Sequence, residues 1–212
     1  MSALTQDRHL SYAEYLALER ETGVKHELYD GVALAMAGGS VAHARLVLAV
    51  GAELRSALRG HPCRAAGSEQ TVFFTEAGLT TYPDAAIFCP PLARAPHDRH
   101  ALTGPTVLVE VLSPSTEGYD SSEKFHLAAR EPSLKHYVLI DQHSVLVEHR
   151  WRDADGGWRL ALLGPGDVLQ LHALNIALPI DALYEDVHEV MEPRRPGWGR
   201  PVTEGDGPAG EG

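Results

Sequence analysis

The stretch V-L-V-E-V-L-S-P-S-T, residues 107–116, places one carboxylate, Glu110, inside an otherwise apolar run. Side chains alternate between the two faces of a β-strand, and both faces of this segment are apolar except at Glu110. A strand that is apolar on both faces is typical of a central parallel strand. An ionised carboxylate buried there costs several kcal/mol unless a cation, a metal or hydrogen-bond donors compensate its charge. Glu110 therefore needs a partner.

The residues that follow predict a helix and a second strand. Ser113 to Thr116 breaks the first strand and supplies capping residues for a helix over about 117–130, and 135–141 is again strand-like. A strand, a helix and a strand in that order predict a parallel crossover connection. The segment therefore favours an α/β fold.

Local signals predict further elements on both sides of this unit. Ser11 and Glu14 form a capping box that begins a short helix, and Asp30-Gly31 favours a tight turn between strands over 25–29 and 32–36. The remaining expected elements are a helix over 40–59, strands over 71–75 and 80–89, an irregular loop over 90–105, strands over 145–151, 158–163 and 168–171 in a β-rich C-terminal extension, and a last helix over 181–190.

Length and composition predict one domain over 1–191 and a disordered tail over 192–212. The chain has 212 residues, of which 44% are hydrophobic, and this is compatible with a single core. The tail is crowded with proline and glycine and ends with an excess of acidic residues. We expect the tail to take no part in the core.

The formal net charge of −11 argues against nonspecific adhesion to phosphate backbones. Any role with nucleic acid must therefore rely on a local basic patch. Arg55 and Arg59, which are one helical turn apart, are candidates for that patch together with Arg45 and Arg64. The alternative, which the sequence alone slightly favours, is that these arginines form a solvated helix face.

The cysteines and the N-terminal segment predict a cytoplasmic protein. Cys63 and Cys89 are too few for a disulfide framework, so we expect them to be reduced, and the N-terminal segment is charged and has no apolar signal core. The longest uncharged stretch near the start, 32–44, is too short to cross a bilayer, so no membrane segment is expected.

A second acid, Asp84, lies in the strand-like segment 82–88 directly after Pro83. If this strand pairs with the strand of Glu110, the two carboxylates approach each other and repel, unless one is protonated or a divalent cation lies between them. Mg²⁺ takes such oxygen ligands. The alternative is that Asp84 caps a turn while Glu110 pairs with an internal lysine or arginine, and spacing alone does not separate the two interpretations.

A resemblance favours the metal site. Pro83-Asp84, 25 intervening residues and Glu110-Val111-Leu112 resemble the Pro-Asp…Asp/Glu-x-Lys motif of restriction-endonuclease-like nucleases. The likeness narrows to the Uma2 family of bacterial proteins through five segments in the family's order: E-L-Y-D-G (27–31), Y-P-D (82–84), V-E-V-L-S-P-S-T (109–116), Y-D-S-S-E-K-F (119–125) and P-S-L-K-H-Y-V-L-I-D (132–141). Together they cover about 10–190, and the combination is specific although each segment alone is weak.

This resemblance implies a restriction-endonuclease-like mixed central sheet flanked by helices, and a metal-dependent endonuclease that hydrolyses phosphodiester bonds of nucleic acid, with DNA as the expected substrate. It implies that Asp84, Glu110 and the backbone carbonyl of Val111 bind Mg²⁺ or Mn²⁺. It also implies a homodimer, because similar nucleases commonly address two strands with two sites.

The lysine of the motif is displaced in this chain. Leu112 stands where it is expected, and in the resembled family the lysine has moved to the following helix, which points to Lys124. A long side chain from that helix can reach back over the carboxylates. The alternative is an exposed helical lysine that pairs with Asp120 or Glu117.

Three other positions carry weaker implications. Glu27 falls where similar nucleases often supply a third acid, although a cross-strand partner for a base such as Lys25 is an equal alternative. Ala128 stands where relatives often have a tyrosine. His43 matches a position where the family often has histidine, but a lone histidine on a half-buried helix is more often a structural hydrogen-bonding group.

Two functions of other classes stay open from the sequence. A catalytically degenerate module of the same fold, used for protein binding or dimerisation, is favoured by the acidic balance, Ala128 and the displaced lysine. A hydrolase or metal-binding protein that acts on a small phosphorylated or acidic molecule has no positive motif. The sequence also lacks a nucleophile elbow and a Walker-type glycine loop, so acyl transfer and nucleotide hydrolysis have little support.

Overall fold

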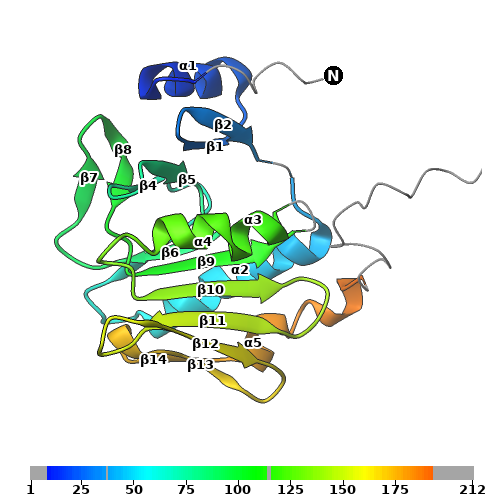
Figure 1. Ribbon diagram of the computed structural model, residues 1–212. Helices are drawn as coiled ribbons and strands as arrows, with labels where there is room; N and C mark the ends of the chain where they lie inside the picture. The colour runs from blue at the N-terminus through cyan, green and yellow to red at the C-terminus, as the bar shows by residue number, and fades with distance from the viewer. Residues whose placement is uncertain (1–8, 37, 114–115, 193–212) are drawn as a thin grey trace, which may run out of the picture.

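A computed structural model describes residues 9–36, 38–113 and 116–192. The expected tail over 192–212 lies outside the described residues except for Glu192. The strands form two six-stranded sheets and a two-stranded ribbon, and helices pack against them (Figure 1). In the part of the chain that is described, no helix is long and apolar enough to cross a membrane.

The central sheet carries the segment around Glu110, and its strand order is β12-β11-β10-β9-β6-β3. Its strands are β3 (Arg64–Gly67), β6 (Ala85–Phe88), β9 (Val107–Leu112), β10 (His136–Asp141), β11 (Val147–Arg152) and β12 (Trp158–Leu163). β9 pairs in parallel with β10 and antiparallel with β6. The predicted parallel crossover and the pairing of the Asp84 and Glu110 strands are therefore confirmed, and the sheet is mixed.

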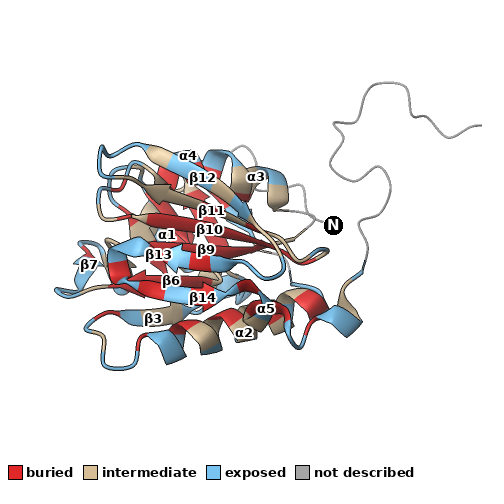
Figure 2. Ribbon diagram, turned by 90° about the horizontal axis from the view of Figure 1, so that it is seen from below, coloured by how far each residue is buried: buried red, intermediate tan, exposed pale blue. Residues whose placement is uncertain are grey.

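Both faces of β9 are covered, as its sequence predicts. One face, with Val109, packs in the core cluster that includes Leu46 and Val50 of α2 (Val41–Ala57). The other face, with Leu108, packs in the cluster that includes Phe125 of α4 (Glu123–Ala128). In Figure 1 α2 lies behind the sheet and α4 in front of it, and Figure 2 shows β9 and β10 almost wholly buried.

The second sheet has the order β2-β1-β5-β4-β8-β7. Its strands are β1 (His26–Tyr29), β2 (Val32–Ala35), β4 (Val72–Phe74), β5 (Leu79–Thr81), β7 (Ala93–Ala95) and β8 (Asp98–Thr103). The predicted hairpin is confirmed, with left-handed backbone at Asp30 (φ 47°) and Gly31 (φ 75°) as a tight turn of this kind requires. α1 (Tyr12–Thr22) begins with the predicted Ser11 capping box and covers this sheet at the top of Figure 1.

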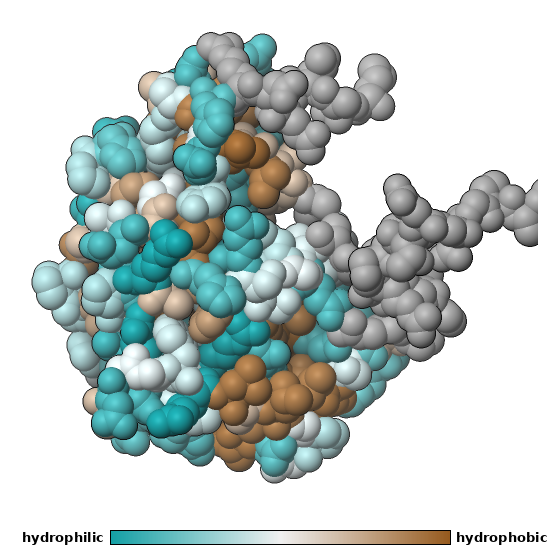
Figure 3. Space-filling model, viewed as in Figure 1, coloured by the Kyte–Doolittle hydropathy of each residue, from teal (hydrophilic) through white to brown (hydrophobic). Residues whose placement is uncertain are grey.

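The C-terminal part first extends the central sheet and then packs on the face of the sheet that α2 covers. β11 and β12 continue the sheet antiparallel, whereas β13 (Val168–Leu171) and β14 (Ile176–Pro179) form a separate ribbon, and α5 (Ile180–Tyr184) packs beside α2. β12 is an edge strand, and its Leu160 and Leu162 are exposed. Figure 3 shows apolar surface gathered in the lower part of the molecule, where Figure 1 places β12 to β14.

Four predicted elements are wrong in their extent. The single strand expected over 80–89 is two strands, β5 and β6, which lie in different sheets and separate at Pro83, because proline cannot donate a ladder hydrogen bond. The irregular loop over 90–105 contains the β7–β8 hairpin. The helix over 117–130 is interrupted at Ser122 into α3 (Glu117–Ser121) and α4. The last helix is only α5 and a 3₁₀ turn, His188–Val190.

The expectation of two reduced cysteines is also wrong. Cys63 and Cys89 form a disulfide between the ends of β3 and β6. These strands pair antiparallel with Arg64 opposite Phe88, and continuing this register by one residue places the two cysteines opposite each other. The bond ties the edge strand β3 to the strand that follows Asp84. The cytoplasmic location stays a prediction, and the reduced state no longer supports it.

Removal of this bond by dithiothreitol, or by Cys63→Ser with Cys89→Ser, is expected to lower the free energy of unfolding by about 3 kcal/mol, because the bond closes a chain segment with a sequence separation of 26. Urea unfolding followed by tryptophan fluorescence measures this change. The double serine variant is the control and shows no response to dithiothreitol. Two free thiols in the mass spectrum of the alkylated, unreduced protein would contradict the pairing.

Candidate active site

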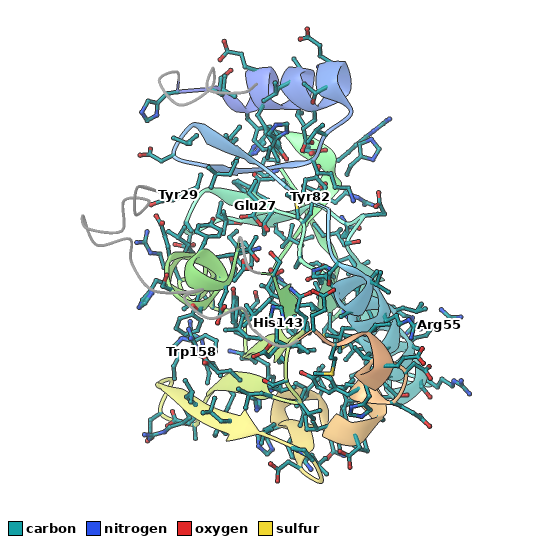
Figure 4. All side chains as sticks on the ribbon, turned by 90° about the vertical axis from the view of Figure 1, so that its right-hand side faces the viewer. Glu27, Tyr29, Arg55, Tyr82, His143 and Trp158 are labelled. Carbon is teal, nitrogen blue, oxygen red and sulfur yellow. A yellow bond between two sulfur atoms is a disulfide. The ribbon has the colours of Figure 1, made fainter. Side chains whose placement is uncertain are left out.

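Lys124 lies at the centre of a buried cluster of acids. Its Nζ is 2.6 Å from Glu27 Oε1, 2.8 Å from Glu110 Oε1 and 3.4 Å from Asp120 Oδ1. No side chain of these four is more than 8% exposed, so water screens the charges little. The cluster joins α3 and α4 to one strand of each sheet, and Figure 4 shows Glu27 between the two layers.

The structure thus brings together three side chains that the sequence analysis singled out: Glu27, Glu110 and Lys124. Lys124 is only 2% exposed, so the alternative of an exposed helical lysine is wrong, although Asp120 one turn earlier is one of its partners. Glu27 does not pair with Lys25, whose Nζ contacts Glu69 instead at 2.5 Å. The fourth expected residue, Asp84, belongs to the same region through the pairing of its strand.

Asp84 and Glu110 lie on neighbouring strands. β6 pairs with β9 through Ala85 opposite Val109, and the next pair in this register is Asp84 opposite Glu110. Directly opposite side chains in an antiparallel pair have Cβ atoms roughly 5 Å apart. Asp84 Oδ2 also accepts a hydrogen bond of 2.8 Å from the backbone N–H of Val111. This bond fixes the carboxylate beside the backbone of β9.

The environment of Glu110 opposes its ionisation. Burial raises the pKa of Glu110 well above its usual value, Lys124 lowers it in part, and the negative charges of Asp120, Asp84 and Glu27 raise it further. Glu110 Oε1 is buried and, although it is close to Lys124, it has no hydrogen-bond partner among the described residues. Within the described chain, Glu110 Oε1 is therefore stabilised only by the nearby positive charge of Lys124.

Lys124 remains a cation. Burial lowers the pKa of its ammonium, but Glu110, Glu27 and Asp120 more than reverse this effect, and the pKa is well above its usual value. Burial also raises the pKa of the Asp120 carboxyl, which Lys124 lowers only in part. One ammonium thus faces three buried carboxylates, with Asp84 beside them. The acidic groups of the cluster outnumber its one cation, so full ionisation of all of them would leave negative charge that Lys124 does not compensate.

Several residues of this region were not assigned a role from the sequence. Thr81 Oγ1 donates a hydrogen bond to Glu27 Oε1, and Tyr137 Oη donates one of 2.8 Å to the backbone carbonyl of Asp120. Tyr119 Oη is buried with no hydrogen-bond partner in the described chain. Tyr119 and Asp120 belong to the Y-D-S-S-E-K-F segment that carries the resemblance, and that was their available signal; Thr81 had none.

His43 contacts the site from α2. Its Nε2 is 3.4 Å from Asp84 Oδ2, and Ser40, the N-terminal cap of α2, fixes the first turn from which His43 projects. Burial lowers the pKa of His43, but Asp84 and the backbone of Val111 outweigh this effect, and the pKa is raised. His43 therefore contacts the two groups, Asp84 and the Val111 backbone, that the resemblance implies as ligands.

The donor set of Asp84, Glu110 and the Val111 carbonyl fits a hard divalent cation. All three are oxygen donors, Glu110 Oε1 has no hydrogen-bond partner among the described residues, and the acidic side chains outnumber the one ammonium. No group of three or more histidine, cysteine or acidic side chains in the described ranges is arranged to hold an ion. Of the three donors, Asp84 and Glu110 would supply the charged oxygens and Val111 a backbone carbonyl oxygen.

Comparison with known proteins shows the family. A family model described as "Putative restriction endonuclease", Uma2, matches residues 12–181. The chain belongs to the Uma2 family. The match spans both sheets and every residue of the acidic cluster around Lys124. The family expected from the five sequence segments is thereby confirmed.

Relatives and a solved structure agree with the family. Two uncharacterized proteins of Synechocystis are 33% and 28% identical to the chain, cover 82% and 83% of it, and are matched over 91% and 100% of their own length. A crystal structure from Anabaena variabilis, described as "a putative nuclease belonging to DUF820", has a TM-score of 0.64 at 16% identity and covers 77% of this chain and 92% of its own. The restriction-endonuclease-like fold is confirmed, and the family and fold support a nuclease-like function.

Replacement of Lys124 by methionine is expected to lower the free energy of unfolding by about 3–5 kcal/mol, because it leaves three buried carboxylates without their cation. Urea unfolding at pH 7 measures the loss. Adding Glu110→Gln to Lys124→Met removes one of the stranded charges and recovers part of the stability.

Lys135→Met is the matched control, because Lys135 Nζ donates only to the Pro132 carbonyl and its loss costs less than about 1 kcal/mol. Equal destabilisation by the two methionine variants would contradict the buried ion cluster.

Proposed function

We propose that this Uma2 protein is a metal-dependent endonuclease that hydrolyses phosphodiester bonds of nucleic acid, with DNA as its substrate. The observation that carries the proposal is the charge imbalance at the buried cluster: one ammonium for three carboxylates, beside Asp84 on the neighbouring strand. A divalent cation would compensate this charge. A hard cation and an ammonium side by side are groups that can stabilise the transition state of phosphodiester hydrolysis.

Each group has a distinct role in the proposed reaction. Asp84, Glu110 and the Val111 carbonyl would hold Mg²⁺ or Mn²⁺, which when bound polarises the phosphate and lowers the pKa of a water ligand. Lys124 keeps its proton because the carboxylates raise its pKa, so it acts as a fixed positive charge that orients the attacking water or stabilises the developing phosphorane. It does not act as the base.

The surrounding residues position these groups. Glu27 and Asp120 hold the ammonium of Lys124, and Thr81 orients Glu27 through its hydrogen bond. His43 and the Val111 N–H orient Asp84 from opposite elements, α2 and β9. The entry route is on the side of Asp84, whose side chain is 14% exposed, more than twice the value for Glu110.

A non-catalytic module of the same fold is the second candidate. Two observations favour it. The ammonium of Lys124 is already engaged by three carboxylates, and Ala128, where relatives often have a tyrosine, is fully buried in the core. In that case the cluster stabilises the fold and binds no cation. A homodimer is proposed for either candidate on the resemblance alone, and light scattering of the purified chain tests it.

Calorimetric titration with Mn²⁺ separates the two candidates. The nuclease proposal expects binding by the wild-type chain and at least roughly tenfold weaker binding by Asp84→Asn and Glu110→Gln, because each substitution removes a charged oxygen ligand without changing size. Bound Mn²⁺ also raises the melting temperature of the wild type but not of Glu110→Gln. Glu148→Gln, a surface acid paired with Arg150, is the control and binds as the wild type does. If the wild type binds Mn²⁺ no more tightly than Asp84→Asn does, the proposed metal-dependent mechanism is wrong.

Activity is tested with supercoiled, linear and single-stranded DNA and with RNA, each incubated with Mg²⁺ or Mn²⁺. We expect EDTA to abolish cleavage and Lys124→Arg to reduce its rate by roughly 10²-fold or more, because the planar guanidinium keeps the charge but does not reproduce the ammonium's position. Circular dichroism confirms that the variant is folded. Cleavage at an unchanged rate would exclude Lys124 from the reaction.

A further inference from the structure

A groove leads away from Asp84 between helix α2 and the edge strand β3. Figure 2 shows α2 beside β3 along the border of the central sheet. The groove is lined by Ala44, Val47, Leu48, Gly51, Ala52, Arg55, Leu58, Arg59 and Gly60 from α2 and the turn after it, by residues 64–70 from β3 and the segment after it, and by Asp84 and Ala85. The acid expected to bind the cation is therefore part of the groove wall.

The direction of the groove follows from strand register. Gly67 pairs with Ala85, so the C-terminal end of β3 lies beside Asp84, whereas Arg64 pairs with Phe88 at the far end. α2 lines the same groove, and Arg55 in its last turn and Arg59 in the turn after it lie toward Arg64, because β3 returns alongside the helix. The groove thus has an acidic, catalytic end and a basic, distal end.

Small residues keep this groove open. Ala44, Gly51 and Ala52 line it from the helix, and Ala65 and Gly67 from the strand. A Cβ atom added at Gly51 or at Gly67 would meet no atom within 4 Å, so neither glycine is required by a close backbone contact. The open space beside these two residues lies along the route between the two ends of the groove.

The distal end of the groove carries positive charge. Arg55 and Arg59 are exposed and form no ion pair with any described residue, and Figure 4 shows Arg55 at the outer surface of α2. Arg64 is held in place by a hydrogen bond of 2.8 Å from Nη1 to the Cys63 carbonyl. Glu69, the acid of the groove besides Asp84, is paired with Lys25. The net charge of −11 makes this basic end a local exception.

We propose that this groove holds the sugar-phosphate backbone of the strand that is cut at Asp84, with Arg55 and Arg59 binding phosphates away from the cut. Arg55 is eleven residues beyond Ala44, or ~16 Å along the helix at 1.5 Å per residue. One strand of B-form DNA advances 3.4 Å per nucleotide, so the first arginine contact falls about five nucleotides from the scissile phosphate. The inference rests on the proposed nuclease function.

Fluorescence anisotropy in EDTA, which prevents cleavage, measures binding of the full chain to a labelled 24-base-pair duplex. Arg55→Ala with Arg59→Ala is expected to weaken binding at least roughly tenfold at low salt, and to reduce the slope of log affinity against log salt by about 1.8, because each phosphate contact contributes about 0.9. Arg94→Ala with Arg130→Ala removes the same charge from exposed positions outside the groove and is the matched control.

A second variant tests the path of the strand rather than its charge. Gly51→Leu places a side chain in the open part of the groove, and leucine favours a helix more than glycine does, so the variant folds. We expect weaker binding with a nearly unchanged salt slope.

Cleavage in Mg²⁺ adds a length dependence. Some duplexes extend fewer than about four base pairs beyond the cut on the groove side. The wild type and the double arginine variant are expected to cut these duplexes equally, because such short duplexes do not reach positions 55 and 59.

The outcomes separate this inference from the proposed function. Wild-type protein that neither binds nor cuts nucleic acid overturns both. If the wild-type protein binds, both double arginine variants lose binding equally and Gly51→Leu binds as the wild type does, the groove is overturned and the nuclease proposal stays intact. A greater loss in the groove pair than in the control pair, together with weaker binding by Gly51→Leu, supports the groove.

Discussion

The buried contact of Lys124 with three carboxylates is the interaction on which the rest of the structure depends. Glu27 comes from a strand of one sheet, Glu110 from the central strand of the other, and Asp120 from the helix before α4. One ammonium thereby links two sheets that share no strand. A buried ion group of this kind gives modest net stability, because desolvation offsets much of its attraction, but removal of one member leaves stranded charges.

The same contact leaves the site with more acidic groups than cations. A purely structural ion pair would match one carboxylate to one ammonium, whereas here the acids outnumber the cation, and Asp84 directly precedes the strand that pairs with the Glu110 strand. Burial raises the pKa of Glu110, and the charges of Asp120, Asp84 and Glu27 raise it further. The family, the fold and the oxygen-rich donor set all agree with a nuclease-like use of these acidic groups.

Basic and acidic residues are unevenly distributed over the molecule, and the net charge does not show this. The overall value of −11 favours no contact with a polyanion, yet Arg55, Arg59 and Arg64 gather at one end of the groove that begins at Asp84. Screening in physiological salt limits the reach of exposed charges to about 8 Å. A local basic end can therefore act almost independently of distant acids, so the composition alone did not decide this question.

The sequence by itself determined the elements whose signals are local. The capping box of α1, the Asp30-Gly31 hairpin and the strand around Glu110 with its parallel crossover depend on residues within a few positions of one another. Glu27, Asp84, Glu110 and Lys124 were found through a resemblance to a family, whose motif records contacts that spacing does not show. Without that resemblance, an exposed and a buried Lys124 were equally compatible with its helix.

Only the tertiary structure decided which sheet each strand joins and where the charges lie. The sequence predicted one strand over 80–89, but the two halves of this segment pair with partners in different sheets. The Cys63–Cys89 bond, the convergence of Glu27 on Lys124 and the groove between α2 and β3 likewise join residues 26 or more positions apart, or surfaces of separate elements. Such contacts depend on long-range packing, and local patterns of hydrophobicity and capping carry no information about them.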